Sequence, residues 1–283
     1  MRALILGAAG LLGRALAAEL ERRGAPLLAL DRAGADVTDA VQVNAVVRSF
    51  APAVVYNCAA FTRVDDCEQR SELASEVNGR AVGTLAEAAR SAGAALVHVS
   101  TDYVFDGASP VAYSEEAAVA PLQEYGRSKL LGERHALSWE RSVVVRTSWL
   151  FGSTGPSFVQ AMLRQLAGPA PVRVVDDQVG CPTYAPYLAR AMADLAALGA
   201  RGIVHYRNQP PISWHGFAVE IARRAAPGRE VVAISTAERP RPARRPAYSV
   251  LDVERFEAIT GRRVEPWTTG LDACLDDLAL AAR

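Results

Sequence analysis

Short apolar runs rich in β-branched residues alternate along the chain with longer stretches in which Ala and Leu recur at helical spacing. Such runs predict strands buried on both faces, because a half-exposed strand shows polar residues at every second position. The predicted strands are 3–6, 27–31, 53–58, 95–100, 142–148 and 172–177, and the predicted helices between them are 11–23, 39–49, 66–91, 122–138 and 156–167. This alternation predicts an α/β fold with a doubly wound parallel sheet.

Beyond about residue 150 the alternation becomes irregular. The pattern there predicts helices at 184–198, at 213–225 and from about 268, and strands at 202–206 and 230–235, with prolines clustered near 210 and 240–246. We therefore expect a smaller, mixed α/β region over the carboxyl edge of the sheet, where ligands of doubly wound folds bind.

Three glycines separate the first predicted strand from the first predicted helix. The segment LGAAGLLG places Gly7, Gly10 and Gly13 in a GxxGxxG pattern, and Asp31 closes the second strand. Glycines at such a turn let backbone N–H groups approach a pyrophosphate, and an acid at the second strand binds ribose hydroxyls. The pattern predicts a Rossmann-type NAD(P)-binding domain at 1–150 and a smaller substrate-binding domain at 151–283, with roughly 171–198 returning to the Rossmann sheet.

The choice between NADPH and NADH stays open in the sequence. Asp31 favours NADH, whereas the guanidinium of the following Arg32 could accept the 2′-phosphate of NADPH. The segment DVTD, residues 36–39, opens a helix, so Asp36 can serve as a helix cap, as an adenine contact or as both.

A second set of polar residues points to proton transfer. Ser100, Thr101 and Asp102 end the fourth predicted strand, and the next helix carries Tyr125 and Lys129 one turn apart. Hydride transfer to a ketone leaves charge on its oxygen, to which a phenol can give a proton while a hydroxyl holds the oxygen in place. We expect Tyr125, Lys129 and Thr101 to be catalytic, although a tyrosine and a lysine at this spacing also arise by chance.

Lys129 is the single lysine among 31 basic residues, the rest of which are arginines. Free tyrosine titrates near 10, so a neighbouring cation helps a phenol act near neutral pH. A compact ammonium can reach both the phenol and a ribose hydroxyl, which the planar fork of arginine does not reproduce. The position of the single lysine therefore supports a chemical role.

The composition limits which binding partners and which cellular compartment we expect for the protein. Basic and acidic residues balance at 31 each, which predicts no nucleic-acid partner, and no apolar run is long enough to predict a membrane span. The four cysteines show no metal-site or disulfide spacing, which favours a reducing, cytoplasmic setting. The basic segment 238–245, ERPRPARR, is interpreted as a solvated loop, with contact to an anionic ligand as the alternative.

The GxxGxxG turn, the strand-end Thr101 and the YxxxK pair resemble the extended branch of the short-chain dehydrogenase/reductase superfamily. Within it, essentially the whole chain is similar to the dTDP-4-dehydrorhamnose reductase family. The segments that carry this resemblance are NCAAFTRVDDCE (57–68), VN (77–78), STDYVFDG (100–107), YGRSKLLGE (125–133), RTSWLFG (146–152), DDQVGCPT (176–183), SWHGFAVEI (213–221) and RPAYSVLD (245–252).

The resemblance implies reduction of the 4-keto group of dTDP-4-dehydro-β-L-rhamnose by NADPH or NADH. The product would be dTDP-L-rhamnose, a donor for bacterial cell-surface polysaccharide. It also implies that Tyr125 donates the proton, that Lys129 binds the nicotinamide ribose and tunes Tyr125, and that Thr101, Asp102 and Trp149 bind the sugar. The implied cofactor contacts are Gly10, Leu11, Leu12, Asp31, Asp36, Val37, Ala59, Ala60 and Val99.

Several of these assignments have structural alternatives. The alternative for Trp149 is a place in the core, and the alternative for Asp102 is a turn-forming role. Val99 is also expected to pack in the core, and the alternative for the DQVGCPT segment is that it only shapes a loop. Some family members hold a magnesium ion with glutamates at a dimer interface, but these glutamates have no match here, so we expect no required metal. A homodimer is left open.

Two other functions compete with the reductase. The Tyr–Lys–Thr set serves the whole superfamily, so a reductase or epimerase of another nucleotide 4-keto sugar is the first alternative. The second is a non-catalytic, NADP-binding regulatory subunit like that of methionine adenosyltransferase, which the complete catalytic set disfavours.

Overall fold

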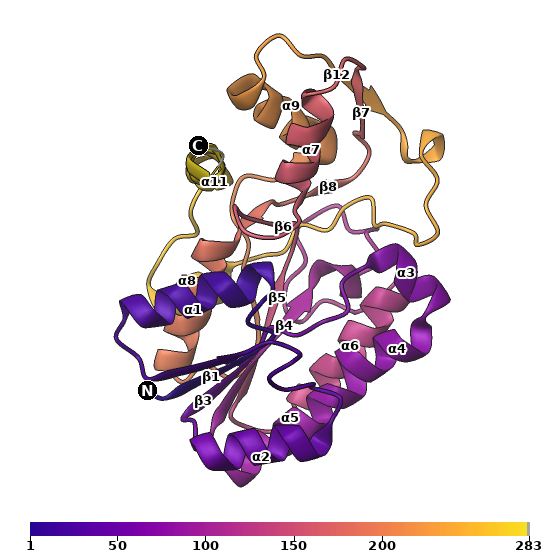
Figure 1. Ribbon diagram of the computed structural model, residues 1–283. Coiled ribbons are helices and arrows are strands. Elements are labelled where there is room, and N and C mark those ends of the chain that lie inside the picture. The colour runs from indigo at the N-terminus through magenta and orange to yellow at the C-terminus, as the bar shows by residue number, and fades with distance from the viewer. Residues whose placement is uncertain (282–283) are drawn as a thin grey trace.

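The computed structural model describes residues 1–281, and a parallel six-stranded sheet lies at its centre (Figure 1). The strands follow the order β2-β1-β3-β4-β5-β10, in which every neighbouring pair is parallel. Their bounds are Ala3–Leu6 (β1), Leu27–Leu30 (β2), Val54–Asn57 (β3), Ala95–Thr101 (β4), Ser142–Thr147 (β5) and Gly202–His205 (β10). The doubly wound, Rossmann-type sheet predicted from the sequence is thereby confirmed.

Helices cover both faces of this sheet. Helices α1 (Leu11–Arg22) and α8 (Ala185–Ala197) pack on one face, and α2 (Ala40–Phe50), α5 (Ala81–Ser91) and α6 (Glu124–Ala136) pack on the other (Figure 1). Successive strand residues serve opposite cores, because side chains alternate across a strand. The apolar runs of the sequence are therefore the strands between two helical layers.

The prediction of a single helix over 66–91 is wrong, because the segment is divided into several shorter helical elements. It comprises α3 (Val64–Gln69), α4 (Ser71–Ser75), the π-helical turn η1 (Glu76–Arg80) and α5. The buried Asn78 side chain in η1 bonds the backbone N–H and C=O of Phe61 and the hydroxyl of Ser128. This anchor fixes the loop after β3 against α6, and helical periodicity does not reveal such an interruption.

The carboxyl-terminal half supplies a second core above the sheet (Figure 1). It is built from α7 (Phe158–Leu166), α9 (Trp214–Ala225), α11 (Trp267–Ala281), β7 (Val172–Val175) and β12 (Val231–Ile234). β7 pairs with β12 and lies outside the six-stranded sheet, so the expected return of 171–198 to that sheet is wrong for its strand. The reason is that β10 occupies the edge position beside β5, whereas α8 does pack on α1.

Short elements that the hydrophobic pattern does not predict shape the carboxyl edge of the sheet. They are η2 (Asp102–Val104), β6 (Leu150–Phe151), β8 (Val179–Gly180), β9 (Thr183–Tyr184), β11 (Ile212–Ser213), η3 (Thr236–Glu238) and α10 (Glu254–Thr260). β6 pairs with β9, and β8 pairs with β11, so the DQVGCPT segment is held beside the strand-end residues of β5. None of the helices within residues 1–281 is long and apolar enough to cross a membrane.

Candidate active site

Two adjoining cavities of about 300 Å³ and 480 Å³ lie along the carboxyl edge of the sheet and share Gly10, Cys58, Ala59 and Ala60. Every site residue predicted from the sequence lines one of them. Gly7, Gly10, Asp31, Arg32, Asp36, Val37, Ala59 and Ala60 line the first, and Leu11, Leu12, Val99, Thr101, Asp102, Tyr125, Lys129 and Trp149 line the second. We call the first cavity the adenosine end and the second the reaction end.

The glycine turn between β1 and α1 fits a pyrophosphate. Gly7 has a φ of 80°, and a side chain there would place its Cβ 2.5 Å from the backbone nitrogen of Ala59. Helix α1 starts at Leu11 after Gly10, which has no side chain to cap the first turn. The free N–H groups of that turn and the positive end of the helix are therefore available to an anion.

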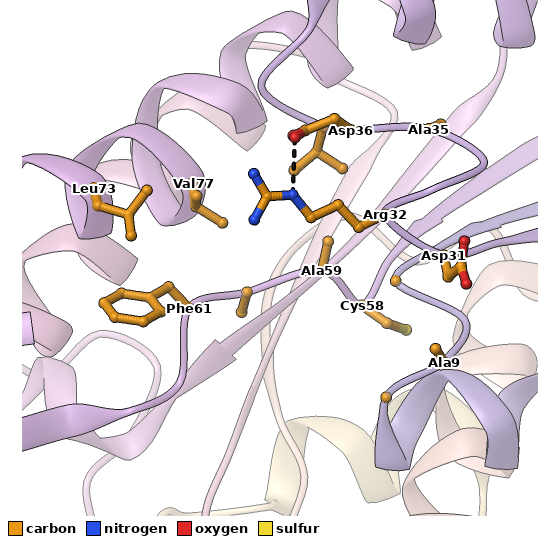
Figure 2. Close-up of a pocket in the computed structure, with 14 residues that line it drawn as sticks. Ala9, Asp31, Arg32, Ala35, Asp36, Cys58, Ala59, Phe61, Leu73 and Val77 are labelled. Atoms are coloured by element: carbon orange, nitrogen blue, oxygen red, sulfur yellow. Dashed lines mark hydrogen bonds and ion pairs between the residues drawn. The ribbon is translucent and has the colours of Figure 1, made fainter. Parts of the chain in front are cut away.

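The adenosine end presents a carboxylate and a guanidinium side by side (Figure 2). One oxygen of Asp31 accepts hydrogen bonds from the amides of Ala33 and Gly34, which leaves the other oxygen for a ribose hydroxyl. The Arg32 side chain is 82% exposed, and its Nε lies 2.9 Å from Oδ2 of Asp36. Hydrogen bonds from Thr38, and more weakly from Arg32, hold the pKa of Asp36 below its usual value.

Apolar side chains close the other side of the same cavity. Phe61, Leu73 and Val77 lie across from Arg32 (Figure 2), and with Ala35 and Val37 they form a surface suited to a flat base. Phe61, Leu73 and Val77 were not identified as site residues from the sequence. The signal that could have found Phe61 is its place in the NCAAFTRVDDCE segment, whereas Leu73 lies in α4 and Val77 in η1, two short elements that the periodicity does not distinguish.

The reaction end brings the three predicted catalytic side chains together from β4 and α6. The Thr101 hydroxyl accepts a hydrogen bond from the Tyr103 amide at 3.1 Å and donates to Oδ1 of Asp102 at 3.0 Å. The ring of Tyr125 stands edge-on to Tyr103 with a centroid distance of 6.2 Å. Lys129 is 2% exposed, so its ammonium is largely withdrawn from bulk solvent.

Burial is the largest cause of the pKa shifts of the side chains at the reaction end. It raises the pKa of the Tyr125 phenol, with a further upward effect from Asp102 and a downward effect from Thr101, so the phenol carries its proton at neutral pH. Burial also lowers the pKa of Lys129 to about 8, against the carboxylate of Glu133, which raises it. A protonated phenol is the state that a proton donor requires. The tuning of Tyr125 by Lys129 stays a prediction.

Asp102 combines burial with an unused acceptor. Its side chain is 2% exposed, and burial raises its pKa to about 7. Within residues 1–281, the buried Oδ2 of Asp102 has no hydrogen-bond partner of good geometry, although the Ser249 side chain lies close enough to lower the pKa of this carboxyl against burial. A buried polar atom without a partner is costly, and a hydroxyl of a bound sugar would satisfy it.

Trp149 forms a flat wall of the reaction end. It is half-buried, has a φ of 46°, and its ring stacks on Trp214 at a centroid distance of 3.6 Å. Gly180 packs against the ring so closely that a Cβ there would lie 2.5 Å from Cε2 of Trp149. A bulky residue at positive φ is strained and is typical of functional sites. The sequence analysis did not identify Trp214, which lies 65 positions away.

The basic segment 238–245 is mostly exposed, but Arg245 turns inward. Its guanidinium contacts the carboxylate of Asp65 in α3 and the carbonyl of Ala243. Neither alternative from the sequence included this internal ion pair. All four cysteines are free thiols, and no cluster of three or more potential ligands that could hold a metal ion occurs in the described part of the chain.

Comparisons with known proteins agree with this geometry. The family model described as RmlD substrate binding domain matches residues 1–280. A dTDP-4-dehydrorhamnose reductase from Streptomyces griseus is 42% identical, covering 95% of this chain and 91% of that protein. A probable dTDP-4,6-dihydroxy-2-methyloxan-3-one 4-ketoreductase from Streptomyces antibioticus is 40% identical, covering 99% of this chain and 97% of that protein.

Solved structures extend the agreement to three dimensions. The structure of dTDP-4-dehydrorhamnose reductase from Bacillus anthracis in complex with NADP superimposes with a TM-score of 0.94 at 35% identity, covering 98% of this chain and 99% of that one. The family match over nearly the whole chain, the identities and the shared fold lead to one conclusion. The chain belongs to the RmlD family, the family of the dTDP-4-dehydrorhamnose reductases.

Proposed function

We propose that the protein reduces the C4 ketone of dTDP-4-dehydro-β-L-rhamnose to dTDP-L-rhamnose with NADPH or NADH, the last step of dTDP-rhamnose biosynthesis. The observation that carries this proposal is the pair of adjoining cavities. It joins a dinucleotide-type glycine turn at one end to Thr101, Tyr125 and Lys129 at the other.

The residues of the reaction end divide the chemistry among them. A bound nicotinamide cofactor supplies the hydride. The Thr101 hydroxyl holds the ketone oxygen, and the Tyr125 phenol gives its proton to that oxygen as negative charge develops. The Lys129 ammonium supplies positive charge beside the phenol and a donor for a ribose hydroxyl, and Trp149 and Asp102 hold the sugar.

Burial of these groups supports the same assignment. Lys129 and Asp102 are each 2% exposed, so water is largely excluded from around them. Charges and dipoles act more strongly in such an environment than in water. The four free thiols fit a reducing compartment, and we place the enzyme in the cytoplasm. Size-exclusion chromatography of the purified protein would test whether it forms a homodimer.

A second candidate function is reduction of a different dTDP-4-keto sugar. The Streptomyces antibioticus relative is named for another keto sugar and is about as similar to this chain as the rhamnose-related proteins. The test is turnover of a panel of dTDP-4-keto sugars, followed by the loss of NADPH absorbance. Turnover of dTDP-4-dehydro-β-L-rhamnose well above the others supports the proposal, and no turnover with that sugar contradicts it.

The regulatory-subunit alternative requires NADP binding without turnover. It gives no reason for a half-buried Tyr125 and the buried Lys129 and Thr101 to line one cavity. Turnover by the purified chain without any other protein excludes it, whereas copurification with a larger synthetase and no turnover would favour it.

A further inference from the structure

A buried ion pair lies directly beneath the reaction end. Glu133 is 1% exposed and Arg146 is 2% exposed. The guanidinium makes two parallel hydrogen bonds to the carboxylate, Nε to Oε1 at 2.8 Å and Nη2 to Oε2 at 2.7 Å. The Ser100 hydroxyl donates to Oε1 at 2.6 Å. Helix α6 is therefore fastened through one carboxylate to both β4 and β5.

The three partners sit next to residues of the site. Ser100 precedes Thr101, and Arg146 lies opposite Ser100 in the β4–β5 register, so the next register position pairs Thr101 with Thr147. On α6, Glu133 follows Lys129 by four residues, and Lys129 follows Tyr125 by four. Residues at this spacing share a helix face. Glu133 thus continues the row formed by the two proton-handling residues.

Stability alone does not account for this pair. Transferring both charges from water to the interior is costly, and replacing a buried ion pair by apolar residues of similar volume is often neutral or stabilising. β5 is otherwise a run of buried residues, SVVVRT, in which an apolar side chain would suit the core. A charge retained there is better explained by the geometry that it fixes.

We propose that Glu133, held by Arg146 and Ser100, is a positioning residue that sets the place and charge of the Lys129 ammonium relative to Thr101. This inference rests on the proposed function for its catalytic consequence only. On the far side Arg146 contacts His205 of β10 at 3.4 Å, and His205 is bonded to the carbonyl of Tyr113. The network therefore spans α6 and three adjacent strands.

Electrostatics give Glu133 a further effect on Lys129. The other titratable groups that interact with the ammonium are the Cys58 thiol, after β3, and His98, on β4. Burial raises the pKa of Cys58 to about 12 and lowers that of His98, so both are neutral near pH 7. Glu133, whose carboxylate is also paired with the Arg146 guanidinium, is the group that raises the pKa of Lys129 most strongly against burial.

The single lysine makes this measurable without substrate. Protein labelled with ¹³C at lysine Cε gives one lysine resonance, whose pH titration reports Lys129 directly. Glu133→Gln should lower the midpoint from about 8 by roughly one pH unit or more, because a paired carboxylate is lost. Glu87→Gln, which removes an exposed carboxylate paired with Arg90, should leave it unchanged.

Turnover supplies the second measurement. Activity that needs the ammonium is lost as pH rises through the Lys129 pKa, so Glu133→Gln should shift this loss to lower pH. At pH 8 a shift of about one pH unit should reduce kcat about fivefold, and a larger shift should reduce it further. KM for the sugar should change less. An unshifted resonance together with wild-type kcat in Glu133→Gln would overturn the inference.

A double variant distinguishes a positioning role of the ion pair from a role in the stability of the fold. Glu133→Leu with Arg146→Met replaces the pair by apolar side chains and should keep a melting temperature near that of the wild type. It should nevertheless show the lowered lysine midpoint and the reduced kcat. Wild-type turnover in this variant would make the pair merely structural. If the wild type fails to reduce the sugar, the proposed function fails, while the titration still decides the effect of Glu133 on Lys129.

Discussion

The two ends of the cavity offer a ligand different means of binding. At the adenosine end Asp31 and Arg32 are exposed, with 82% of the Arg32 side chain in solvent, and the close contacts are made by backbone at the glycine turn. At the reaction end Lys129 and Asp102 are each 2% exposed, and Glu133 beneath it is 1% exposed. Exposed charges contribute little and are screened by salt, whereas buried charges act strongly and depend on each partner. Substitutions should therefore be far more damaging at the reaction end.

The largest effect is expected from Tyr125→Phe. It removes the proposed proton donor and leaves the ring in its edge-on contact with Tyr103, so kcat should fall by about 10²–10⁴ with little change in cofactor affinity. Steady-state kinetics and cofactor titration measure the two quantities. Tyr187→Phe, which changes a tyrosine outside both cavities, is the matched control. A kcat within threefold of the wild type would remove Tyr125 from the mechanism.

Lys129→Arg should have the next largest effect, although the charge is kept. The planar guanidinium is larger than an ammonium and the site is buried, so we expect a decrease in kcat of about tenfold or more. Arg127→Lys, on the exposed side of the same helix, makes the reverse exchange and should be silent. Near-normal turnover of Lys129→Arg would show that the single lysine is not chemically required.

Arg32→Ala tests the exposed end and should have the smallest effect. Loss of a guanidinium that can meet the 2′-phosphate should raise KM for NADPH by up to about tenfold and leave KM for NADH nearly unchanged. The NADPH effect should shrink at high salt, because the group is exposed. Arg22→Ala, another exposed arginine in an ion pair, is the control. An equal effect on both cofactors would argue against a role in their discrimination.

Local patterns in the sequence were sufficient to predict much of the fold and of the candidate site. Strand and helix alternation, the glycine turn and the four-residue spacing of Tyr125 and Lys129 depend on neighbouring residues, and the structure has each where the pattern predicts it. Errors arose where long-range pairing decides the outcome. β7 was predicted to join the central sheet, but it pairs with β12 instead. The helix predicted over 66–91 is broken at Arg70 and contains the π-helical turn η1, in which Asn78 bonds Phe61 and Ser128.

The sequence by itself thus determined the sheet, the glycine turn and the candidate catalytic residues, because these follow from local periodicity and from chemistry at strand ends. Only the tertiary structure decided that Glu133 and Arg146 form a buried pair, that Trp214 backs Trp149, and that Arg245 turns inward. In a sequence a buried charge and a surface charge look alike. The energy of a charge depends on the solvent and the partners around it, and those are set when distant segments meet.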